Sequence, residues 1–352
     1  MQLECEKYIK FWKRYRGAQA APEIAATREV WSSYRLKEPN TCIVNAHKKC
    51  SSLQTIAQYG MWAKSDVCSE PSTSAWQRAL CDHQNQTWMA ADSECGEVCG
   101  YSPPQACEIL GRGAPRNVSI VGDSLMRQLF QAMSCITNGD YVHGSMKAGA
   151  SIKSLQKCSD DNQFNDKKCQ GLVPTSSIHL PGPPCRAHNV TLHFTPVMSP
   201  FNTGAALLIK NLPPHGLTTT EKILAELKPD DIFIIGVGLW DNMEWDRYIK
   251  QYFSPMLKYM DGHKKTMPHV LAVLPHAVHV NMSYKGVTPQ KVVAYNRKVG
   301  HFLQTHGVAF IDTVNISVEA ARESYDGMHY VGSVNYLKAS LILRHIESAI
   351  KV

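Results

Sequence analysis

The chain has 352 residues, of which 44% are hydrophobic and 19% are charged. This composition supplies a full hydrophobic core, which excludes a disordered, collagenous or coiled-coil protein, and the length fits two domains at most. The net charge of +7 is spread along the sequence, so nucleic acid is not expected as a partner. The longest apolar run, residues 232–240, is shorter than the ~20 residues of a membrane helix, so no membrane span is expected.

The first part of the chain, residues 1–109, is rich in cysteine and has weak hydrophobic periodicity. We expect it to form an irregular N-terminal extension that packs on the core. All twelve cysteines lie between Cys5 and Cys185, and the only close pair is Cys95 and Cys99. Zinc sites need paired cysteines with histidine partners, so this pattern favours disulfides over zinc.

Five N-glycosylation sequons also favour an oxidising compartment. They are at Asn85, Asn117, Asn189, Asn281 and Asn315, and Asn117 is expected to be unmodified because it opens a predicted strand. We expect a glycoprotein of the secretory pathway, in the Golgi lumen or outside the cell, whose signal peptide or anchor is absent from this sequence. A cytosolic thiol-rich protein would show the same cysteine count.

Residues 110–352 alternate short β-branched runs with helical patterns, which predicts an α/β domain with a parallel sheet covered by helices. The predicted strands are residues 118–121, 190–197, 232–238, 270–274 and 308–313. Three helix starts are also predicted: a capping box at residues 218–221, Thr288 with Pro289, and Ser333. A polar stretch at about residues 137–188 is predicted to be a long loop insertion, and such loops are often functional.

The segment with the clearest chemistry is Gly122-Asp123-Ser124, between a predicted strand and a predicted helix. This placement presents Ser124 at the carboxyl edge of the sheet and at a helix N-terminus, where backbone N–H groups can stabilise an oxyanion. The alternative is that Asp123 or Ser124 only caps the helix. The placement, rather than the tripeptide itself, favours a nucleophile.

A serine nucleophile needs a base, and the base needs a group that orients it. Asp326 and His329 lie on the loop after the last strand, from which His329 can reach Ser124 and Asp326 can fix the tautomer of the ring. The same Asp-x-x-His pattern occurs at Asp140 and His143, so position selects the later pair. The alternative for His329 is a loop histidine bonded to the backbone.

Gly-Asp-Ser-Leu at residues 122–125 and Asp-x-x-His at residues 326–329 resemble the GDSL/SGNH hydrolase superfamily. The continuation Ser124-Leu125-Met126-Arg127, the cysteine-rich N-terminal part and the signs of a luminal protein are more similar to its PC-esterase branch. That branch includes trichome-birefringence-like polysaccharide O-acetyltransferases and the catalytic domains of capsule and sialate O-acetyltransferases. The resemblance covers roughly residues 95–350. It implies a three-layer α/β/α fold with Ser124 as nucleophile, His329 as base and Asp326 as its orienter.

The resemblance also implies donors for an oxyanion hole, and here the match is incomplete. The superfamily has an asparagine just after a central strand. The corresponding segment here is residues 236–242, and it has glycine at the position where the asparagine is expected. Either Asn242 reaches in from further along, or the backbone N–H of Ser124 acts with that of Gly144 or Gly238. The alternative for the glycines is close packing of a strand against a helix.

Several side chains suit a carbohydrate substrate. Trp240 and Trp245 are candidates for stacking on sugar rings, and Asp241 could bond sugar hydroxyls; packing in the core or at its rim is the alternative for the tryptophans. Beside the nucleophile, Asp123 and Arg127 are further candidates, and Arg127 would either clamp an acid group or pair with a surface carboxylate. His276 and His279 have no further ligands at metal-like spacing, so no metal is predicted.

These features predict a carbohydrate O-acetyltransferase that forms an acyl-serine intermediate and acts on a polysaccharide or glycan. A carbohydrate acetylesterase of the same fold is the alternative, because the sequence does not fix whether sugar or water resolves the intermediate. A non-catalytic glycan-binding protein is the second alternative. No bound cofactor is expected; acetyl-CoA or another acetyl donor would be a co-substrate, and a membrane-bound acetyl-donor transporter could supply it.

Overall fold

The structure, a computed structural model, describes most of the chain from residue 60 onward. The described residues are 60–64, 66–69, 78–82, 86–90, 100–111, 117–165, 169–174, 178–179, 185, 190–197, 201, 216–278, 286–320 and 323–349. Predictions for Cys5, for the pair Cys95 and Cys99, for His279 and for three of the sequons, Asn85, Asn189 and Asn281, lie outside these residues.

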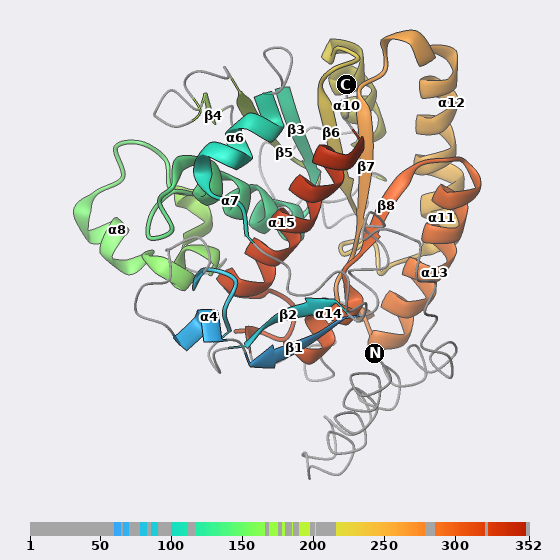
Figure 1. Cartoon of the computed structure of the whole chain (residues 1–352). Helices are drawn as coiled ribbons and strands as arrows, with labels where there is room; N and C mark the ends of the chain where they lie inside the picture. The colour runs from blue at the N-terminus through green and yellow to red at the C-terminus, as the bar shows by residue number, and fades with distance from the viewer. Residues whose placement is uncertain are drawn as a thin grey trace.

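A six-stranded sheet forms the centre of the molecule, in the order β4-β5-β3-β6-β7-β8 (Figure 1). Its strands are β3 (Asn117–Gly122), β4 (Ile178–His179), β5 (Thr191–Pro196), β6 (Ile232–Gly236), β7 (His269–Leu274) and β8 (Ala309–Asp312). Neighbours from β5 to β8 pair in parallel, and β4 pairs antiparallel with β5 at one edge. The five predicted strands and the mainly parallel α/β sheet are therefore confirmed.

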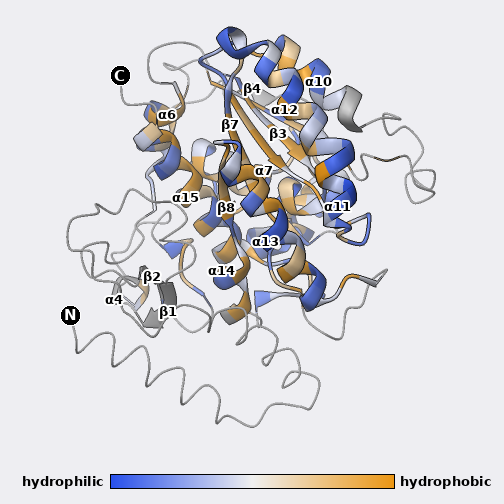
Figure 2. Cartoon of the chain, turned by 90° about the vertical axis from the view of Figure 1, so that its right-hand side faces the viewer, coloured by the Kyte–Doolittle hydropathy of each residue, from blue (hydrophilic) through white to orange (hydrophobic). Residues whose placement is uncertain are grey.

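Helices cover both faces of this sheet, so the fold has three layers (Figure 2). Alternate residues of a strand point to opposite faces: on β6, Ile232 and Ile234 pack into one core cluster, and Phe233 and Ile235 pack into the other. The first cluster lies against α6 (Pro103–Gly111), α7 (Ser124–Asn138) and α15 (Gly332–Ala349), and the second against α10 (Gly216–Glu226), α12 (Ser254–Gly262) and α13 (Pro289–Thr305).

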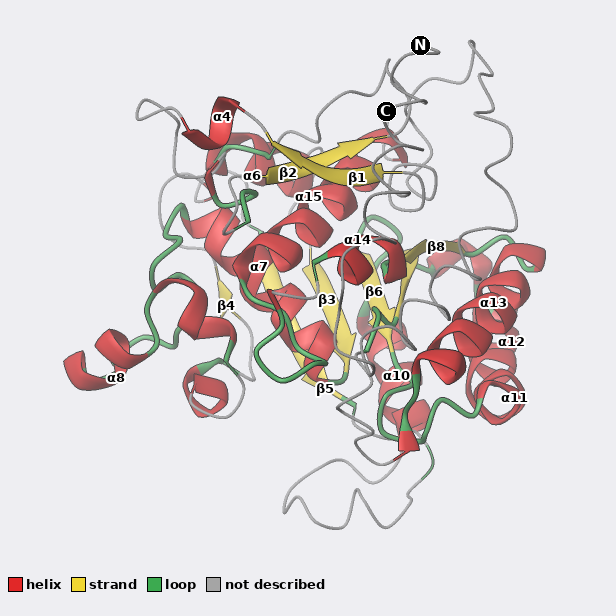
Figure 3. Cartoon of the chain, turned by 90° about the horizontal axis from the view of Figure 1, so that it is seen from below, coloured by secondary structure: helices red, strands yellow, loops and turns green. Residues whose placement is uncertain are grey.

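The insertion at residues 137–188 has more regular structure than the predicted loop. α7 runs into it as far as Asn138, and it contains α8 (Ile152–Lys157), the 3-10 helices η1 (Asp160–Phe164) and η2 (Gln170–Leu172), and β4. These helices are too short for hydrophobic periodicity to reveal them, and α8 has no buried residue and lies at the edge of the molecule (Figure 3). The buried side chains of Gln163 and Phe164 hold η1 against the core.

The N-terminal part contacts the core at separate points. β1 (Gly60–Lys64) and β2 (Gln86–Ala90) form an antiparallel pair, with α4 (Asp66–Ser69) between them in sequence. The buried Trp62 donates its indole N–H to the carbonyl oxygen of Ile316, on α14 (Val314–Glu319), at 3.0 Å. α6 belongs to the core and spans the predicted domain boundary between residues 109 and 110.

Disulfides cross-link the N-terminal part and the insertion. Among the described residues they join Cys68 to Cys81, Cys107 to Cys185, and Cys158 to Cys169. The second links α6 to the insertion, and the third closes the segment that holds η1. Cys135 on α7 is a buried free thiol, and burial raises the pKa of that thiol to about 12.

Helix starts follow the sequence signals only in part. Thr288 caps α13 as predicted, and its hydroxyl accepts from the N–H of Lys291 at 3.4 Å. α10 begins at Gly216, ahead of the predicted capping box, and α15 begins at Gly332, so Ser333 lies in its first turn. The carboxylate of Asp161 in the insertion accepts from the N–H of Gly332 at 3.0 Å, so a distant residue caps α15.

Two sequons fall within the described residues, and both asparagines take part in the fold. The amide nitrogen of Asn117 donates to the carboxylate of Asp231 at 3.2 Å. Asn315 on α14 is buried. None of the helices in the described ranges has the length and apolarity that crossing a membrane requires.

Candidate active site

Ser124 stands at the junction of β3 and α7. β3 ends at Gly122, which has a φ of +151° and where a Cβ atom would collide with the carbonyl oxygen of Gly236 on β6, so this approach of the two strand ends requires glycine. Asp123 caps α7, and its Oδ1 accepts from the N–H of Leu125 at 3.0 Å. The turn presents Ser124 at the carboxyl edge of the sheet, where it was predicted.

The structure brings Ser124, His329 and Asp326 into one line of hydrogen bonds. His329 Nε2 lies 2.7 Å from Ser124 Oγ, and His329 Nδ1 lies 2.8 Å from Asp326 Oδ2. An ionised carboxylate only accepts, so Nδ1 carries the hydrogen and Nε2 presents its lone pair to the hydroxyl of Ser124. This is the geometry that a serine nucleophile with an oriented base requires.

The two Asp-x-x-His segments have the same backbone motif but different surroundings. In the later one, Oδ1 of Asp326 accepts from the N–H groups of Met328 and His329, at 3.0 and 2.8 Å. In the earlier one, Oδ1 of Asp140 accepts from the N–H groups of two residues in the same way, but the ring of His143 bonds to a backbone carbonyl of the insertion. Position in the fold separates the two, as predicted.

Electrostatics favour an ionised Asp326. Burial alone would raise the pKa of Asp326, but the hydrogen bond and charge of His329, with the two backbone donors, outweigh burial and hold that pKa below its usual value. A charged carboxylate can stabilise a positive charge that forms on the ring of His329. Ser124 and His329 are only 5% and 9% exposed, so this charge would develop in a partly desolvated site.

Neighbouring side chains hold the loop that carries His329. The ring of Tyr325 stacks on that of His329, with centroids 5.9 Å apart and planes 10° from parallel. The hydroxyl of Ser324 donates to the carbonyl oxygen of His329 at 2.9 Å. The sequence did not single out either residue.

Asp123, a predicted substrate-binding residue, has both carboxylate oxygens in hydrogen bonds to backbone N–H groups. It is buried, and its second oxygen, Oδ2, accepts from the N–H of Leu239 at 3.4 Å, which ties the nucleophile turn to the loop after β6. Burial raises the pKa of Asp123 to about 6, although its two backbone donors and the charges of His329 and Arg127 act in the opposite direction. The helix-capping alternative is therefore correct for Asp123.

Gly144 is wrong as a donor for the oxyanion hole. Its N–H donates to the carbonyl oxygen of Asp140 at 3.0 Å, and its backbone packs against Cys135. Cys135 lies on α7 about 16 Å along the helix axis from Ser124, at about 1.5 Å per residue. The prediction failed because α7 extends to Asn138 before the chain turns back.

Of the other oxyanion candidates, Ser124 and Gly238 lie at the carboxyl edge of the sheet, where the oxyanion would form. The N–H of Ser124 is in the first turn of α7, where no intrahelical acceptor exists. Gly238 precedes Leu239, whose N–H reaches Asp123, and a side chain at Gly238 would meet the ring of Tyr295, so the packing alternative also holds there. Asn242 is held elsewhere, because its Oδ1 accepts from Nζ of Lys291 at 2.6 Å.

The predicted sugar-binding residues divide between buried and partly buried positions. Asp241 is buried and accepts from the hydroxyl of Tyr248 at 2.8 Å, so it is wrong as a surface contact for sugar hydroxyls. Arg127 is also buried, which removes it from the surface. Trp240 and Trp245 are partly buried against the second core cluster, and Trp245, at the start of α11 (Trp245–Tyr248), has Nζ of Lys298 at 5.4 Å from its ring centroid.

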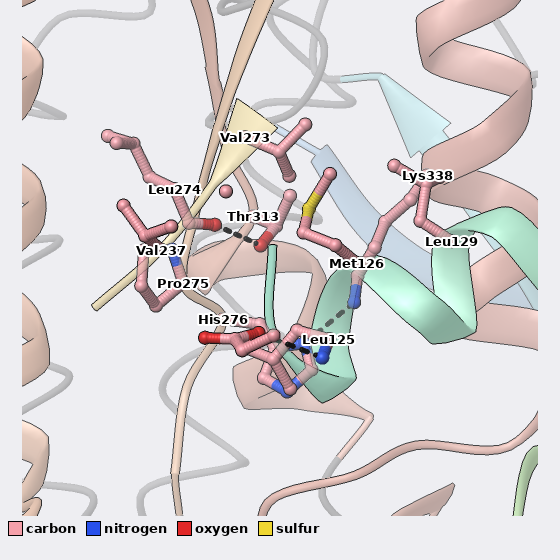
Figure 4. Close-up of a pocket in the computed structure, with 12 residues that line it drawn as sticks. Leu125, Met126, Leu129, Val237, Val273, Leu274, Pro275, His276, Thr313 and Lys338 are labelled. Carbon is pink, nitrogen blue, oxygen red and sulfur yellow. Dashed lines mark hydrogen bonds between the residues drawn. The ribbon is translucent and has the colours of Figure 1, made fainter. Parts of the chain in front are cut away.

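Sequence reasoning missed a buried pair behind the loop that carries His329. Nζ of Lys338 lies 2.6 Å from Nδ1 of His276, and both line a narrow cavity between α7, α15 and the ends of β6 and β7 (Figure 4). His276 had been considered only as a metal ligand. A signal did exist for Lys338, because it lies at helical spacing from the apolar residues Val334 and Leu341 of α15.

Comparison with known proteins finds no matching family model and no matching curated protein. Solved structures that match include a lipolytic G-D-S-L family member from Veillonella parvula, at 12% identity and a TM-score of 0.33 over 66% of this chain and 96% of that one. An acetyl-xylooligosaccharide esterase from Geobacillus matches at 15% identity and a TM-score of 0.37, over 67% of this chain and 95% of its own. A carbohydrate acetylesterase from Sinorhizobium meliloti matches at 15% and 0.32, over 66% and 97%. These low values leave the assignment of function to the site itself.

Proposed function

We propose that this chain is an acyl-transfer enzyme of the GDSL/SGNH type, with Ser124 as nucleophile, His329 as general base and Asp326 as the group that orients it. One observation carries the proposal: a continuous line of hydrogen bonds, of 2.7 and 2.8 Å, joins Ser124 Oγ through the ring of His329 to Asp326. A protein that only bound glycans would not need this line. Helix capping alone would not need it either.

In the first step, Ser124 Oγ attacks the carbonyl carbon of the acyl donor while Nε2 of His329 takes the hydroxyl proton. The negative charge moves to the carbonyl oxygen, and the N–H of Ser124, with that of Gly238 as the second candidate, would hold it. His329 then gives the proton to the leaving group as the tetrahedral intermediate collapses. The products of this step are the acyl ester of Ser124 and the protonated leaving group.

In the second step, His329 takes a proton from the acceptor hydroxyl as that oxygen attacks the acyl-serine. Collapse of the second intermediate returns the proton to Ser124 Oγ and releases the acylated acceptor. We infer that the acceptor is a sugar hydroxyl and the acyl group acetyl, which makes the protein a carbohydrate O-acetyltransferase of the PC-esterase kind. The support for this choice is the resemblance of residues 122–127 and of the cysteine-rich N-terminal part to that branch.

We also propose a setting for this reaction. The disulfides among the described residues support an oxidising compartment, the Golgi lumen or the cell exterior. There, acetyl-CoA or another acetyl donor would act as a co-substrate, with a membrane-bound transporter as its source. A polysaccharide or glycan would be the acceptor, and the partly buried Trp240 and Trp245 are the candidates for contact with it.

A fluorophosphonate probe, which reacts with activated serines, tests the nucleophile. The wild type should be labelled at Ser124, the Ser124→Ala variant should not, and a variant of Ser154, on α8 at the edge of the molecule, should be labelled like the wild type. Incubation with p-nitrophenyl acetate and xylan, mannan or sialylated oligosaccharides then tests the acceptor. Acetylated sugar supports the transferase, whereas acetate as the sole product identifies the acetylesterase.

A further inference from the structure

The buried pair of Lys338 and His276 contacts the loop that carries His329. His276 Nδ1 lies 2.6 Å from Nζ of Lys338, and His276 Nε2 forms a short hydrogen bond with the carbonyl oxygen of Met328. Met328 directly precedes His329 in the chain. We propose that Lys338 is a positioning residue, which acts through His276 and the carbonyl of Met328 to fix the place of His329. This inference rests on the proposed function, because it assigns a task to groups behind the same site.

The hydrogen bonds determine where the protons of the pair lie. A carbonyl oxygen only accepts, so Nε2 of His276 must carry a hydrogen. At 2.6 Å, Nδ1 of His276 and Nζ of Lys338 cannot both point a hydrogen at each other, so one proton lies between them. Whether that proton is on nitrogen Nζ or Nδ1, Nε2 keeps its hydrogen and donates to Met328. Lys338 therefore supplies the partner that Nδ1 needs while Nε2 of His276 donates to the loop.

The surroundings restrict both side chains. His276 and Lys338 are almost fully buried, and the ring of Tyr330 packs edge-on against that of His276, with centroids 4.7 Å apart. Nζ of Lys338 also lies 3.4 Å from Oδ1 of Asn335. Burial lowers the pKa of Lys338 to about 7, while the negative charge of Asp123 acts in the opposite direction. In Figure 4, Lys338 reaches from α15 toward His276 beside the start of α7.

Loss of the Lys338 donor has a specific consequence. In Lys338→Met, Nδ1 of His276 would then be a buried acceptor facing the apolar chain of methionine, an arrangement that costs free energy. Rotation of the ring that takes Nδ1 to another donor would relieve this cost and would break the hydrogen bond from Nε2 to the carbonyl oxygen of Met328. Because His329 follows Met328, a shift of even 1 Å would weaken the alignment with Ser124 and could cost about 100-fold in rate.

The test compares variants by the rate at which the fluorophosphonate probe labels Ser124. Lys338→Met keeps the aliphatic chain and removes the donor, and we expect labelling to slow about 10- to 100-fold. His276→Leu should slow it by a similar factor. His276→Gln is the conservative rescue, since its side-chain amide keeps an N–H donor for the carbonyl oxygen of Met328 and has no ring nitrogen that needs Lys338 as a partner. We therefore expect labelling within about 3-fold of the wild type for His276→Gln, and the same rate when Lys338→Met is added to it.

The dependence of the Lys338→Met effect on His276 distinguishes a positioning role from a simple loss of stability. Tyr252→Phe provides the control, because it removes a buried hydrogen bond of 2.6 Å to Thr220 on the other face of the sheet. All variants are compared at the same folded fraction. For Lys338→Met, turnover of p-nitrophenyl acetate should show a lower kcat, with KM changed less than about 3-fold.

The outcomes distinguish the two proposals. Absence of labelling in the wild type overturns the proposed function. If the wild type is labelled and folded Lys338→Met is labelled at the same rate, the positioning role alone is overturned. The positioning role is also overturned if Lys338→Met slows labelling by the same factor whether or not His276→Gln is present. If Lys338→Met does not fold, the comparison of His276→Leu with His276→Gln decides, and equal rates in those two contradict the inference.

Discussion

The hydroxyl of Tyr325 donates to the carbonyl oxygen of Phe164 at 3.1 Å, and the ring of the same tyrosine stacks on His329. On the other side of His329, the N–H of Gly332 donates to Asp161 at 3.0 Å. Asp161 and Phe164 both belong to η1 in the insertion. The insertion therefore contacts the loop of the proposed base both before and after His329 in the sequence. The disulfide between Cys158 and Cys169 closes the segment that contains η1.

This arrangement predicts that the Cys158–Cys169 disulfide supports activity. Replacing both cysteines by alanine should slow acylation of Ser124 about 10-fold, because η1 would no longer hold Tyr325 and Gly332 in place. The same change should lower the free energy of unfolding by about 3 kcal/mol, the value expected for a loop of this length. Probe labelling at a temperature where the variant is folded measures the first effect, and urea unfolding measures the second.

The chain offers a matched control. The disulfide between Cys68 and Cys81 spans 13 residues and that between Cys158 and Cys169 spans 11, so the two should stabilise the fold by similar amounts. Removing the first should lower stability without a matching loss of labelling rate. Equal losses of rate in the two double variants would mean that the insertion does not support the base.

Asp326→Asn should reduce turnover of p-nitrophenyl acetate by about 10⁴-fold. Two backbone N–H groups fix an acceptor at the Oδ1 position, so the new amide nitrogen would face His329 Nδ1. The amide would donate to Nδ1 and leave the hydrogen on Nε2, where it faces Ser124 and cannot take a proton. Asp140→Asn makes the same change in the equivalent backbone motif and should retain activity; a loss below 10-fold in Asp326→Asn would rule out the assigned role.

The pH dependence of stability should change in Asp123→Asn. Burial raises the pKa of Asp123 to about 6 in the folded chain, above its ordinary value of 3.8, so the folded state binds this proton more tightly than the unfolded state. The resulting stabilisation is full below about pH 4 and is lost as the pH rises through about 6. Relative to the wild type, Asp123→Asn should therefore gain on the order of 2 kcal/mol between pH 4 and pH 7.

Urea unfolding at the two pH values measures this gain. Asp261→Asn, on an exposed side chain paired with Lys264, controls for the loss of one negative charge. The structure shows Asp123 as buried. An equal difference in unfolding free energy between Asp123→Asn and the wild type at pH 4 and pH 7 would contradict that burial.

The sequence was sufficient for the five parallel strands and for the line from Ser124 to Asp326, but not for β4. Strand periodicity and the carboxyl edge of a parallel sheet are local and topological rules. It was not sufficient where long-range packing decides. Gly144 was misplaced because the length of α7 is set by its tertiary contacts, and Asp241 was misjudged because its partner Tyr248 becomes a neighbour only after the chain turns. The capping of α15 by Asp161 depends on a contact between residues far apart in sequence, which no local signal reveals.

The acyl-serine intermediate tests the central claim most directly. The folded protein would be mixed with p-nitrophenyl acetate, quenched in acid within the first turnover, digested and analysed by mass spectrometry. The account predicts an acetyl group on the peptide that contains Ser124, absent from Ser124→Ala and strongly reduced in Asp326→Asn. A folded wild type that releases p-nitrophenol without acetylation of Ser124, or that never reacts, would contradict it.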